Sequence, residues 1–265
     1  MKISSYQTKS AVVVVGNFRY LLKYLKNFII NLENKGNYKG DVVVLTSKFS
    51  QSWVIKKIIK YPNLHILKPL KIRFPKKTKE QYLKLDTGGQ PNRFKFKNFQ
   101  WFKLNIFSED MKYWQNILYL DINLTIHYDI NGIFKLNPQN YFYAKADSYP
   151  EYKTTLSTQF DSTHVLYKKL QDNFDLQDVR YFQTGLMYFN TSIIKKNMIQ
   201  EIIDLAIKYP ISITNEQGVL NLYFQQESLF YKEIPEHIDG RIFYYYWMVG
   251  GKEITITKQL VEKYK

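Results

Sequence analysis

The sequence predicts one α/β domain in which helices flank a mostly parallel central sheet. Two β-branched apolar runs of strand length, 11–15 and 41–45, lie on either side of a segment whose apolar residues recur at helical spacing. A helix-like segment and a third strand-like run follow, so the chain begins β-α-β-α-β, as open parallel sheets do. The length of 265 residues suits one large domain, and no linker separates a second core, so we predict a single domain over 1–265.

Each predicted element has its own local signal. The first strand ends at Gly16-Asn17, a turn signal, and the helix after it has Gly36 just past its end. The unbroken apolar character of the first two strands indicates burial on both faces of the sheet. The same reasoning predicts further strands at 63–67, 117–121, 141–146 and 185–190, and helices at 53–60, 98–109, 191–208 and 215–225.

The segment 68–97 interrupts this alternation. It is rich in Lys and Arg, and it contains Pro69, Pro75, Pro91 and the pair Gly88-Gly89. Because proline and glycine punctuate regular structure, we predict a basic loop or excursion within the domain.

Composition and charge narrow the possible classes of function. Hydrophobic residues make up 45% of the chain, enough for a sizeable core and too many for wholesale disorder. The absence of Cys excludes disulfides, thiolate metal sites and a cysteine nucleophile. With 38 Lys and Arg against 23 Asp and Glu, the net charge is +15, which favours polyanionic partners: nucleic acid, an anionic membrane, or the phosphates of a nucleotide.

The sequence also predicts a soluble, cytoplasmic protein. The first ten residues are polar and lack the apolar stretch of a signal peptide. The apolar runs are strand-sized and far shorter than a bilayer requires, so we expect no membrane span.

The segment with the clearest chemistry is the end of the strand at 117–121. This buried strand runs directly into Asp121-Ile-Asn123. In an open α/β sheet, ligands bind beyond the carboxyl ends of the strands. A carboxylate there, with a second oxygen ligand two positions on, can hold Mg²⁺ or Mn²⁺ against a diphosphate. The alternative is that both polar residues only turn the chain.

A series of segments in this order resembles glycosyltransferase family 8, the family of glycogenin. They are Asn17-Phe-Arg-Tyr20, Trp101-Phe-Lys103-Leu-Asn-Ile-Phe107, Ile117-Leu-Tyr-Leu-Asp121-Ile-Asn123, Asp129-Ile-Asn-Gly-Ile-Phe134, Phe182-Gln-Thr-Gly185-Leu-Met and Asn215-Glu-Gln217-Gly-Val-Leu-Asn221. The resemblance implies a GT-A fold that binds a UDP-sugar with Mn²⁺, or Mg²⁺, and transfers the sugar with retention of anomeric configuration. The acceptor that it implies is a glycan or a protein.

The resemblance also implies roles for individual residues. Those expected to bind the nucleotide-sugar are Tyr20, Lys103, Asp121, Asp147, Gln183 and Gly185. Those expected at the metal are Asp121, Asn123 and His237. Gln217 or Glu216 would lie beside the anomeric carbon and stabilise the positive charge that develops there, and the sequence leaves the choice between them open.

This sequence departs from the family pattern at several of these positions. Asn123 replaces the second metal-binding Asp, which removes a negative charge from the metal site. The pairs Gln183-Thr184 and Glu216-Gln217 lengthen side chains that are Asn-Ser and Asp-Gln in the family. The family's His-x-x-Gly-x-x-Lys-Pro-Trp segment is matched only by His237-Ile-Asp-Gly240, so the assignment of His237 rests on half a motif.

Two other functions remain open from the sequence. The first is a binding or structural protein on the same fold that has lost catalysis through these departures. The second is a nucleic-acid-binding protein, because Phe74, Phe94 and Phe96 are interleaved with Lys and Arg in 68–97. No recognition motif accompanies them, so we expect no stable nucleic-acid complex. Since a UDP-sugar cannot account for the whole positive charge, we expect that the acceptor is acidic.

Overall fold

A seven-stranded sheet forms the centre of the protein. The computed structural model describes residues 8–46, 52–85, 93–124, 126, 129–139, 141–148, 153–177, 180–229, 231–235, 237–238 and 241–242. The strands are β1 (Thr8–Val15), β2 (Asp41–Leu45), β3 (Leu64–Leu67), β4 (Trp114–Leu120), β5 (Phe142–Ala146), β6 (Phe182–Asn190) and β7 (Tyr231–Glu233). Their order is β3-β2-β1-β4-β6-β5-β7. A separate pair, β8 (His237–Ile238) and β9 (Arg241–Ile242), is antiparallel.

The sheet is mostly parallel, as the sequence predicts. Neighbouring strands from β3 to β4 run parallel, and so do β5 and β7. The exception is β6, which is antiparallel to both β4 and β5. Because the strand order turns back between β1 and β4, a crevice can open between their carboxyl ends.

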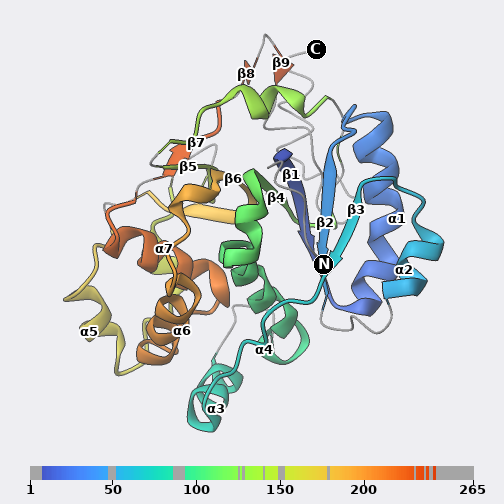
Figure 1. Cartoon of the computed structure of the whole chain (residues 1–265). Helices are drawn as coiled ribbons and strands as arrows, with labels where there is room; N and C mark the ends of the chain where they lie inside the picture. Colours follow the sequence, from blue (N-terminus) through green and yellow to red (C-terminus); the bar gives the residue numbers. More distant parts are fainter. Residues whose placement is uncertain are drawn as a thin grey trace.

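Helices cover both faces of the sheet (Figure 1). The α-helices are α1 (Phe18–Asn34), α2 (Ser52–Ile58), α3 (Lys76–Lys84), α4 (Arg93–Phe96), α5 (Tyr167–Gln171), α6 (Met198–Lys208) and α7 (Glu216–Gln226). The 3-10 helices are η2 (Asn98–Phe107), η3 (Glu109–Tyr113), η4 (Asn131–Lys135), η5 (Leu156–Gln159) and η6 (Thr191–Ile193). Figure 1 shows α1 and α2 on one side of the sheet and α6 and α7 on the other.

Alternate residues of β1 face two different cores. Val12 and Val14 belong to the apolar cluster that contains the buried face of α1. Ala11 and Val13 belong to the cluster that contains η2, α6 and α7. All four side chains are fully buried, which explains why this strand is an unbroken apolar run.

The helix α1 has the periodicity and the ends that its sequence predicts. Its buried residues recur at helical spacing, and they are Leu21, Leu25, Phe28, Ile29 and Leu32. The Asn17 side chain accepts the Tyr20 backbone N–H over 2.8 Å and so caps the helix. A Cβ at Gly36 would lie 2.6 Å from the Leu32 carbonyl oxygen, so only glycine fits at the other end. The cap fixes the first turn of α1 directly beyond β1.

The described part of 68–97, where the sequence predicts a basic loop or excursion, is partly helical. It contains α3 and α4. Tyr82 of α3 is buried, stacks on Phe94 with ring centroids 5.0 Å apart, and donates its hydroxyl to the Ala206 carbonyl over 3.2 Å. Phe74 packs on Tyr82 and on Trp101. These rings anchor α3 to the core, so Phe74 and Phe94 are not a surface for stacking nucleic-acid bases.

The predicted helix at 98–109 is the 3-10 helix η2. Its buried residues are Trp101 and the unbroken run from Lys103 to Phe107, so most of its C-terminal half lies inside the protein. The predicted helix at 191–208 is divided into η6 and α6, because the Asn190 side chain caps a short turn first by accepting the Ser192 N–H. In the part of the chain that the structure describes, no helix combines the length and apolarity needed to cross a bilayer.

One buried amide joins α7 to β6, and its loss tests this packing. Asn221 accepts the Phe182 N–H over 2.9 Å and donates to the Phe182 carbonyl over 2.9 Å. The variant Asn221→Ala leaves both backbone groups buried without these partners, so we expect it to lose about 2–4 kcal/mol of unfolding free energy. Urea unfolding measures the loss. The control Gln226→Ala, at an exposed position of the same helix, should change stability by less than about 0.5 kcal/mol, and an equal loss in both variants would contradict the role of Asn221.

Candidate functional site

A cleft of about 590 Å³ opens at the carboxyl ends of β1 and β4. It lies where the strand order of the sheet reverses, the position at which open α/β sheets bind ligands. The residues that line it are Val15, Asn17, Arg19, Tyr20, Lys23, Tyr24, Lys97, Phe99, Gln100, Lys103, Tyr119, Asp121, Ile122 and Asn123. The sequence therefore predicts the place of the cleft through Asp121, Asn123, Tyr20 and Lys103.

The lining is strongly cationic. Among the described residues of the lining, the basic ones are Arg19, Lys23, Lys97 and Lys103, and the one carboxylate is Asp121. The first turn of α1 also lies at the cleft, and the positive end of a helix dipole favours an anion. This arrangement suits a ligand that carries several negative charges.

Three aromatic rings, tilted against one another, form one wall of the cleft. The Tyr20 ring centroid lies 4.6 Å from that of Tyr24 and 5.0 Å from that of Phe99. Burial, and after it the negative charge of Asp121, raise the pKa of Tyr20 far above its ordinary value, so its hydroxyl stays protonated. Flat, partly buried rings of this kind suit a planar ligand group such as a nucleobase.

Asp121 is held from several sides and still faces the cleft. The Tyr119 hydroxyl donates to Asp121 Oδ1 over 2.5 Å, and the Asp121 backbone N–H donates to the Gly185 carbonyl over 2.8 Å. Burial, together with this carboxylate, raises the pKa of Tyr119 well above its ordinary value, so the hydroxyl remains a donor. The Asp121 side chain is 36% exposed, which leaves oxygen surface for a ligand.

Lys103 is a buried cation between two carboxylates. Its Nζ lies 2.8 Å from Glu216 Oε1 and 3.4 Å from Asp121 Oδ1. It also donates to Thr184, to the carbonyl over 3.0 Å and to Oγ1 over 2.9 Å. Burial acts to lower the pKa of Lys103, but the charges of Asp121 and Glu216 outweigh it and leave the pKa raised. The ammonium group is therefore fixed in its charged form at the floor of the cleft.

Glu216 lies below this floor. Its side chain is 1% exposed, and its Oε1 accepts the Thr184 hydroxyl over 3.1 Å in addition to Lys103. Its Oε2 is buried and has no hydrogen-bond partner among the described residues. Glu216 also opens α7, where the helix dipole favours a carboxylate. The geometry makes Glu216 the counter-ion of Lys103.

Gln217, the next residue, shares Thr184 with Lys103 and Glu216 but has its other hydrogen bonds elsewhere. Its Nε2 donates to Gln159 Oε1 over 2.9 Å and to Asp147 Oδ2 over 3.3 Å. Its Oε1 accepts the Thr184 backbone N–H over 3.1 Å. The network thus joins the residue after β5, the end of η5 and the start of α7, and it includes two of the residues that the sequence predicts, Asp147 and Gln217.

Gln183 and Gly185, which both belong to β6, lie beside Asp121. A Cβ at Gly185 would come within 3.5 Å of both Asp121 Oδ2 and Gln183 Oε1. Glycine at this position therefore keeps open the space between the carboxylate and the amide. Both of these predicted residues therefore lie next to Asp121, and their contact with a sugar stays a prediction.

His237 is the predicted site residue that the structure does not place. Its backbone lies in β8, but its side chain lies outside the described part of the chain, so its prediction as a metal ligand remains untested. Within the described ranges, no group of three or more His, Asp or Glu could hold a metal ion. Asp121 and Asn123 are the predicted ligands that do line the cleft.

Several residues of the site are absent from the sequence prediction. Arg19 and Lys23 were detectable, because their spacing of four residues places them on one face of a predicted helix next to Tyr20. Tyr119 was detectable as well, since it lies two residues before Asp121 in a strand and so on the same face. Gln159 lies in a polar segment without periodicity, and no local signal marks it.

The buried ion pair of Lys103 with Glu216 makes a test of stability possible. The variant Lys103→Met leaves Glu216 buried without its cation, and we expect it to lose about 3–5 kcal/mol of unfolding free energy. Adding Glu216→Gln should restore most of that loss, because the uncompensated charge is then gone. Denaturant unfolding of both single variants and the double variant measures the coupling.

The surface pair Lys168–Asp172 supplies the matched control. Its side chains are 80% and 54% exposed, so Lys168→Met should cost no more than about 1 kcal/mol. If Lys103→Met were as mild as Lys168→Met, or if Glu216→Gln restored nothing, the assignment of Glu216 as the counter-ion would be wrong.

The fold of this chain is shared with glycosyltransferases of known structure. No protein family and no curated protein matches it by sequence. It resembles the glycosyltransferase GlyE of Streptococcus pneumoniae TIGR4 (TM-score 0.50, 18% identity over 86% of this chain and 46% of GlyE). It also resembles the bifunctional glycosyltransferase WbbM (TM-score 0.52, 14% identity, 88% of this chain and 40% of WbbM).

A third similar structure is the galactosyltransferase LgtC in complex with donor and acceptor sugar analogues (TM-score 0.55, 13% identity, 86% of this chain and 73% of LgtC). The chain spans less than half the length of GlyE and of WbbM. At these identities the likeness concerns the fold, and it confirms the predicted GT-A architecture. Membership of family 8 is not shown by any sequence match and remains a prediction. The α/β domain described above is a glycosyltransferase fold of the GT-A type.

Proposed function

We propose that this protein is a glycosyltransferase that transfers a sugar from a UDP-sugar to an acceptor with retention of configuration. The observation that carries the proposal is the cleft at the ends of β1 and β4, which four cationic side chains and a group of tilted aromatic rings line together with Asp121. This combination suits a ligand with a planar base and a diphosphate. It occurs at the ligand-binding edge of a fold shared with glycosyltransferases.

The cationic lining would both bind the donor and assist the reaction. Cleavage of the bond between the sugar and UDP leaves additional negative charge on the diphosphate. Lys103 is fixed in charged form, and Arg19 and Lys23 project from the first turns of α1. Charges that are already in place stabilise the leaving group without reorganisation, which lowers the barrier.

A divalent metal ion fits the oxygen atoms at this end of the cleft. Asp121 offers a carboxylate and Asn123 an amide, which are ligand types that Mg²⁺ and Mn²⁺ accept, the diphosphate and water completing the coordination. We propose that these two residues hold Mn²⁺ or Mg²⁺. When bound, such an ion neutralises charge on the diphosphate.

At the sugar end we assign the anomeric carbon to the side of Gln217. Glu216 is buried beneath Lys103, whereas Gln217 is partly exposed and bonded to Asp147 and Gln159. An amide oxygen or the Asp147 carboxylate can stabilise the positive charge that develops on the sugar ring. Gln183 and Gly185 would border the sugar between this network and Asp121.

The experiment that tests the proposal is a panel of nucleotide-sugars with and without Mn²⁺. We expect at least one UDP-sugar to raise the melting temperature and to release UDP, and we expect chelation of the metal to reduce both effects. Asp121→Ala should abolish the release of UDP. The control Asp110→Ala, at an exposed aspartate outside the cleft, should keep it.

The readouts separate this proposal from a protein that has lost catalysis. Binding of UDP-sugars without release of UDP over long incubation, with or without an acceptor, would support the binding protein. No thermal shift with any nucleotide-sugar and any divalent ion would refute the transferase and leave a structural protein on the same fold. Release of UDP that survives Asp121→Ala would refute the assignment of the site.

The role of the cationic lining has its own test on α1. Lys23 lines the cleft, whereas Lys26, three residues later, is exposed and does not. We expect Lys23→Ala to weaken UDP binding by about 1 kcal/mol, roughly fivefold in Kd, and we expect the difference to shrink as salt is added. Lys26→Ala should leave the Kd unchanged. Isothermal titration calorimetry at two ionic strengths makes the comparison, and equal effects of the two variants would show that only net charge matters.

A further inference from the structure

The outer side of the helices α1 and α2 carries exposed apolar side chains. Of the seven large apolar side chains that are exposed in the described part of the chain, four belong to these two helices: Leu22 and Ile30 of α1, and Trp53 and Ile58 of α2. Such a concentration of exposed apolar side chains is typical of a surface that contacts a partner. We propose that α1 and α2 dock this protein onto the surface of a membrane that contains anionic lipids.

The two helices lie on the same side of the protein. The helix α1 connects the parallel neighbours β1 and β2, and α2 connects the parallel neighbours β2 and β3. Because such crossover connections are right-handed, both helices cover the same face of the sheet. Their buried sides share one apolar core, to which α1 contributes Phe28 and α2 contributes Ile55. Figure 1 shows the two helices next to each other at one edge of the molecule, so their outer sides can contact one flat partner together.

Trp53 is the most exposed apolar side chain of this surface. Its exposed fraction is 65%, whereas Trp101 and Trp114 are buried. Lys56 and Lys57 follow it by three and four residues and are exposed, so they lie beside the indole on the same side of α2. Tryptophan is enriched at the boundary between the hydrocarbon and the headgroups of a bilayer. The long side chains of lysine can lie along the same boundary with their charged ends in the headgroup layer.

The helix α1 repeats this combination of side chains. Leu22, Lys26 and Ile30 follow one another at intervals of four residues, and all three are exposed. Residues at this spacing lie on one side of a helix, so a basic side chain stands between two apolar ones. On a bilayer, the apolar side chains can enter the boundary of the acyl chains while the lysine pairs with a lipid phosphate.

The charge of the two helices matches an anionic surface. Together they contain five Lys and Arg residues and one acidic residue, Glu33. Lys26, Lys56 and Lys57 have no ion-pair partner within the described ranges, so no carboxylate there neutralises them. Each lysine close to an anionic membrane strengthens binding about fivefold.

The mixture of lysines with apolar side chains distinguishes a membrane from other anionic partners. The centres of protein–protein interfaces are depleted of Lys, whereas lysines stand between or beside the apolar residues on both of these helices. A nucleic acid could stack a base on Trp53, but it offers no apolar surface to Leu22 and Ile30. A lipid surface supplies phosphates for the lysines and hydrocarbon beneath them for the apolar side chains.

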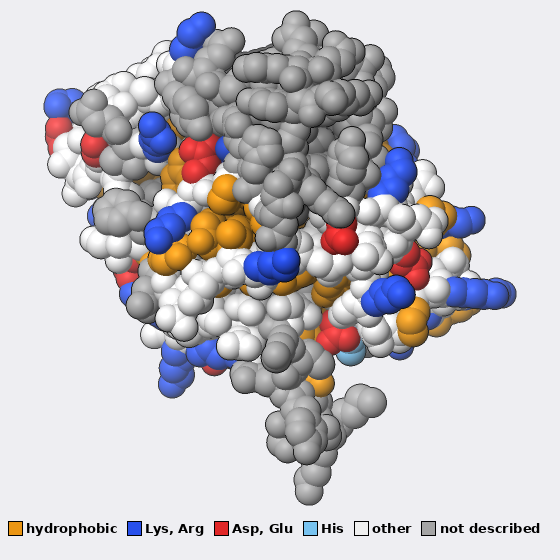
Figure 2. Space-filling view, turned by 90° about the horizontal axis from the view of Figure 1, so that it is seen from above, with side chains coloured by type: hydrophobic (Ala, Val, Ile, Leu, Met, Phe, Trp, Pro, Cys, Tyr) orange, Lys and Arg blue, Asp and Glu red, His pale blue; other side chains and the backbone are white. Residues whose placement is uncertain are grey.

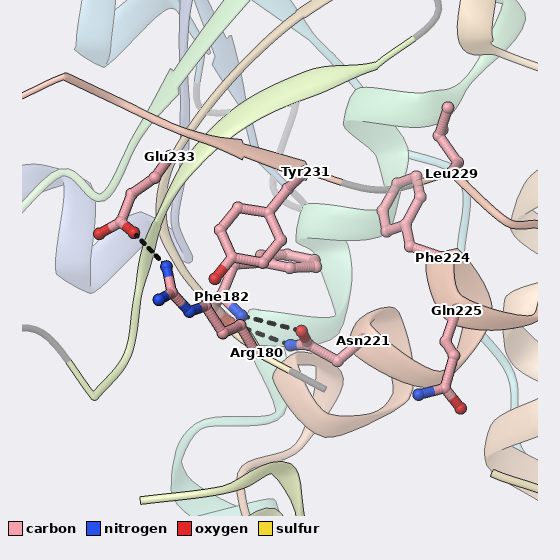
Figure 3. Close-up of a pocket in the computed structure, with 8 residues that line it drawn as sticks. All are labelled: Arg180, Phe182, Asn221, Phe224, Gln225, Leu229, Tyr231 and Glu233. Carbon is pink, nitrogen blue, oxygen red and sulfur yellow. Dashed lines mark hydrogen bonds and ion pairs between the residues drawn. The ribbon is translucent and has the colours of Figure 1, made fainter. Parts of the chain in front are cut away.

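The pocket beside α7, on the other side of the sheet, presents no comparable apolar surface. Phe182 and Phe224 line it, but these rings are buried. Its polar side chains are engaged within the protein, since Asn221 bonds to the Phe182 backbone and Arg180 pairs with Glu233 (Figure 3). These residues stabilise the packing of α7 on the sheet, whereas the apolar side chains on the outer side of α1 and α2 face the solvent.

Co-sedimentation of the full chain with lipid vesicles tests the proposal. We expect binding to vesicles of phosphatidylglycerol and phosphatidylcholine in equal parts, at least about tenfold weaker binding to phosphatidylcholine alone, and release by added salt. Replacing both Lys56 and Lys57 by Ser should weaken binding about thirtyfold, because two charges are lost. Trp53→Ser should weaken it about tenfold, because an apolar side chain no longer leaves the water.

Matched controls lie near α5, which packs on the other side of the sheet through Leu170. Lys168 and Lys169 of this helix are exposed, and so is Val165 just before it. Replacing both lysines by Ser removes the same charge as the double variant of α2, and Val165→Ser removes an exposed apolar side chain. We expect all of these controls to bind the vesicles as tightly as the unaltered protein.

Tryptophan fluorescence gives a second readout. We expect the emission to shift to shorter wavelength when the protein binds the anionic vesicles, because the exposed indole of Trp53 then enters a less polar medium. Trp53→Phe should keep most of the binding and lose the shift. A shift that survives Trp53→Phe would contradict the contact of α2 with the lipid.

Several further outcomes would overturn the proposal. They are equal binding to both kinds of vesicle, no binding to either, and an equal loss of binding in the variants of α2 and α5. A dimer in solution that Trp53→Ser dissociates would assign the surface to a second copy of the chain. Tighter binding of a single-stranded oligonucleotide than of vesicles, through the same lysines, would assign it to nucleic acid. None of these assays uses a nucleotide-sugar, so docking and the release of UDP can each fail while the other stands.

Discussion

The site depends on one buried ammonium group. Lys103 extends from η2 and bonds to three other parts of the fold: the end of β4 through Asp121, β6 through Thr184 and α7 through Glu216. An ion in this position is tolerated only with its counter-charges present, so the relative places of these elements are restricted to those that supply them. Electrostatic interactions therefore fix the positions of the residues at the floor of the cleft, whereas burial of apolar side chains stabilises the sheet.

The sequence predicts most of the sheet and the centre of the cleft, for identifiable reasons. The strands β1 and β2 are buried on both faces, so their apolar runs are unambiguous, and Asp121 is marked by its place at the end of such a strand. The antiparallel direction of β6 depends on which strands it pairs with, a choice that no local pattern records. The same holds for Gln159, which reaches Gln217 only because a segment without periodicity folds back onto α7.

The net charge of +15 divides into a local part and a dispersed part. The local part is the cationic lining of the cleft, which the proposed donor would use. The basic segment with α3 is anchored through Tyr82 and its aromatic neighbours, so its lysines stay on the surface while its rings are buried. On the face seen from above, Lys and Arg side chains are scattered among Asp and Glu around the rim of the described part (Figure 2). Because the two signs of charge are mixed, the described residues on that face form no single positively charged surface for a polyanion.

The consecutive residues Glu216 and Gln217 of α7 have different partners and therefore different structural roles. Neighbouring positions on an α-helix point about 100° apart, and although both side chains contact Thr184, their other partners differ. Glu216 is turned inward and holds Lys103, while Gln217 is turned toward Asp147 and Gln159. A carboxylate at the inward position is required by the buried cation, and an amide at the outward position can donate to Asp147 where a second carboxylate would repel it. The order of the two residues is thus fixed by charge, and exchanging them would disrupt the floor of the cleft and the network above it together.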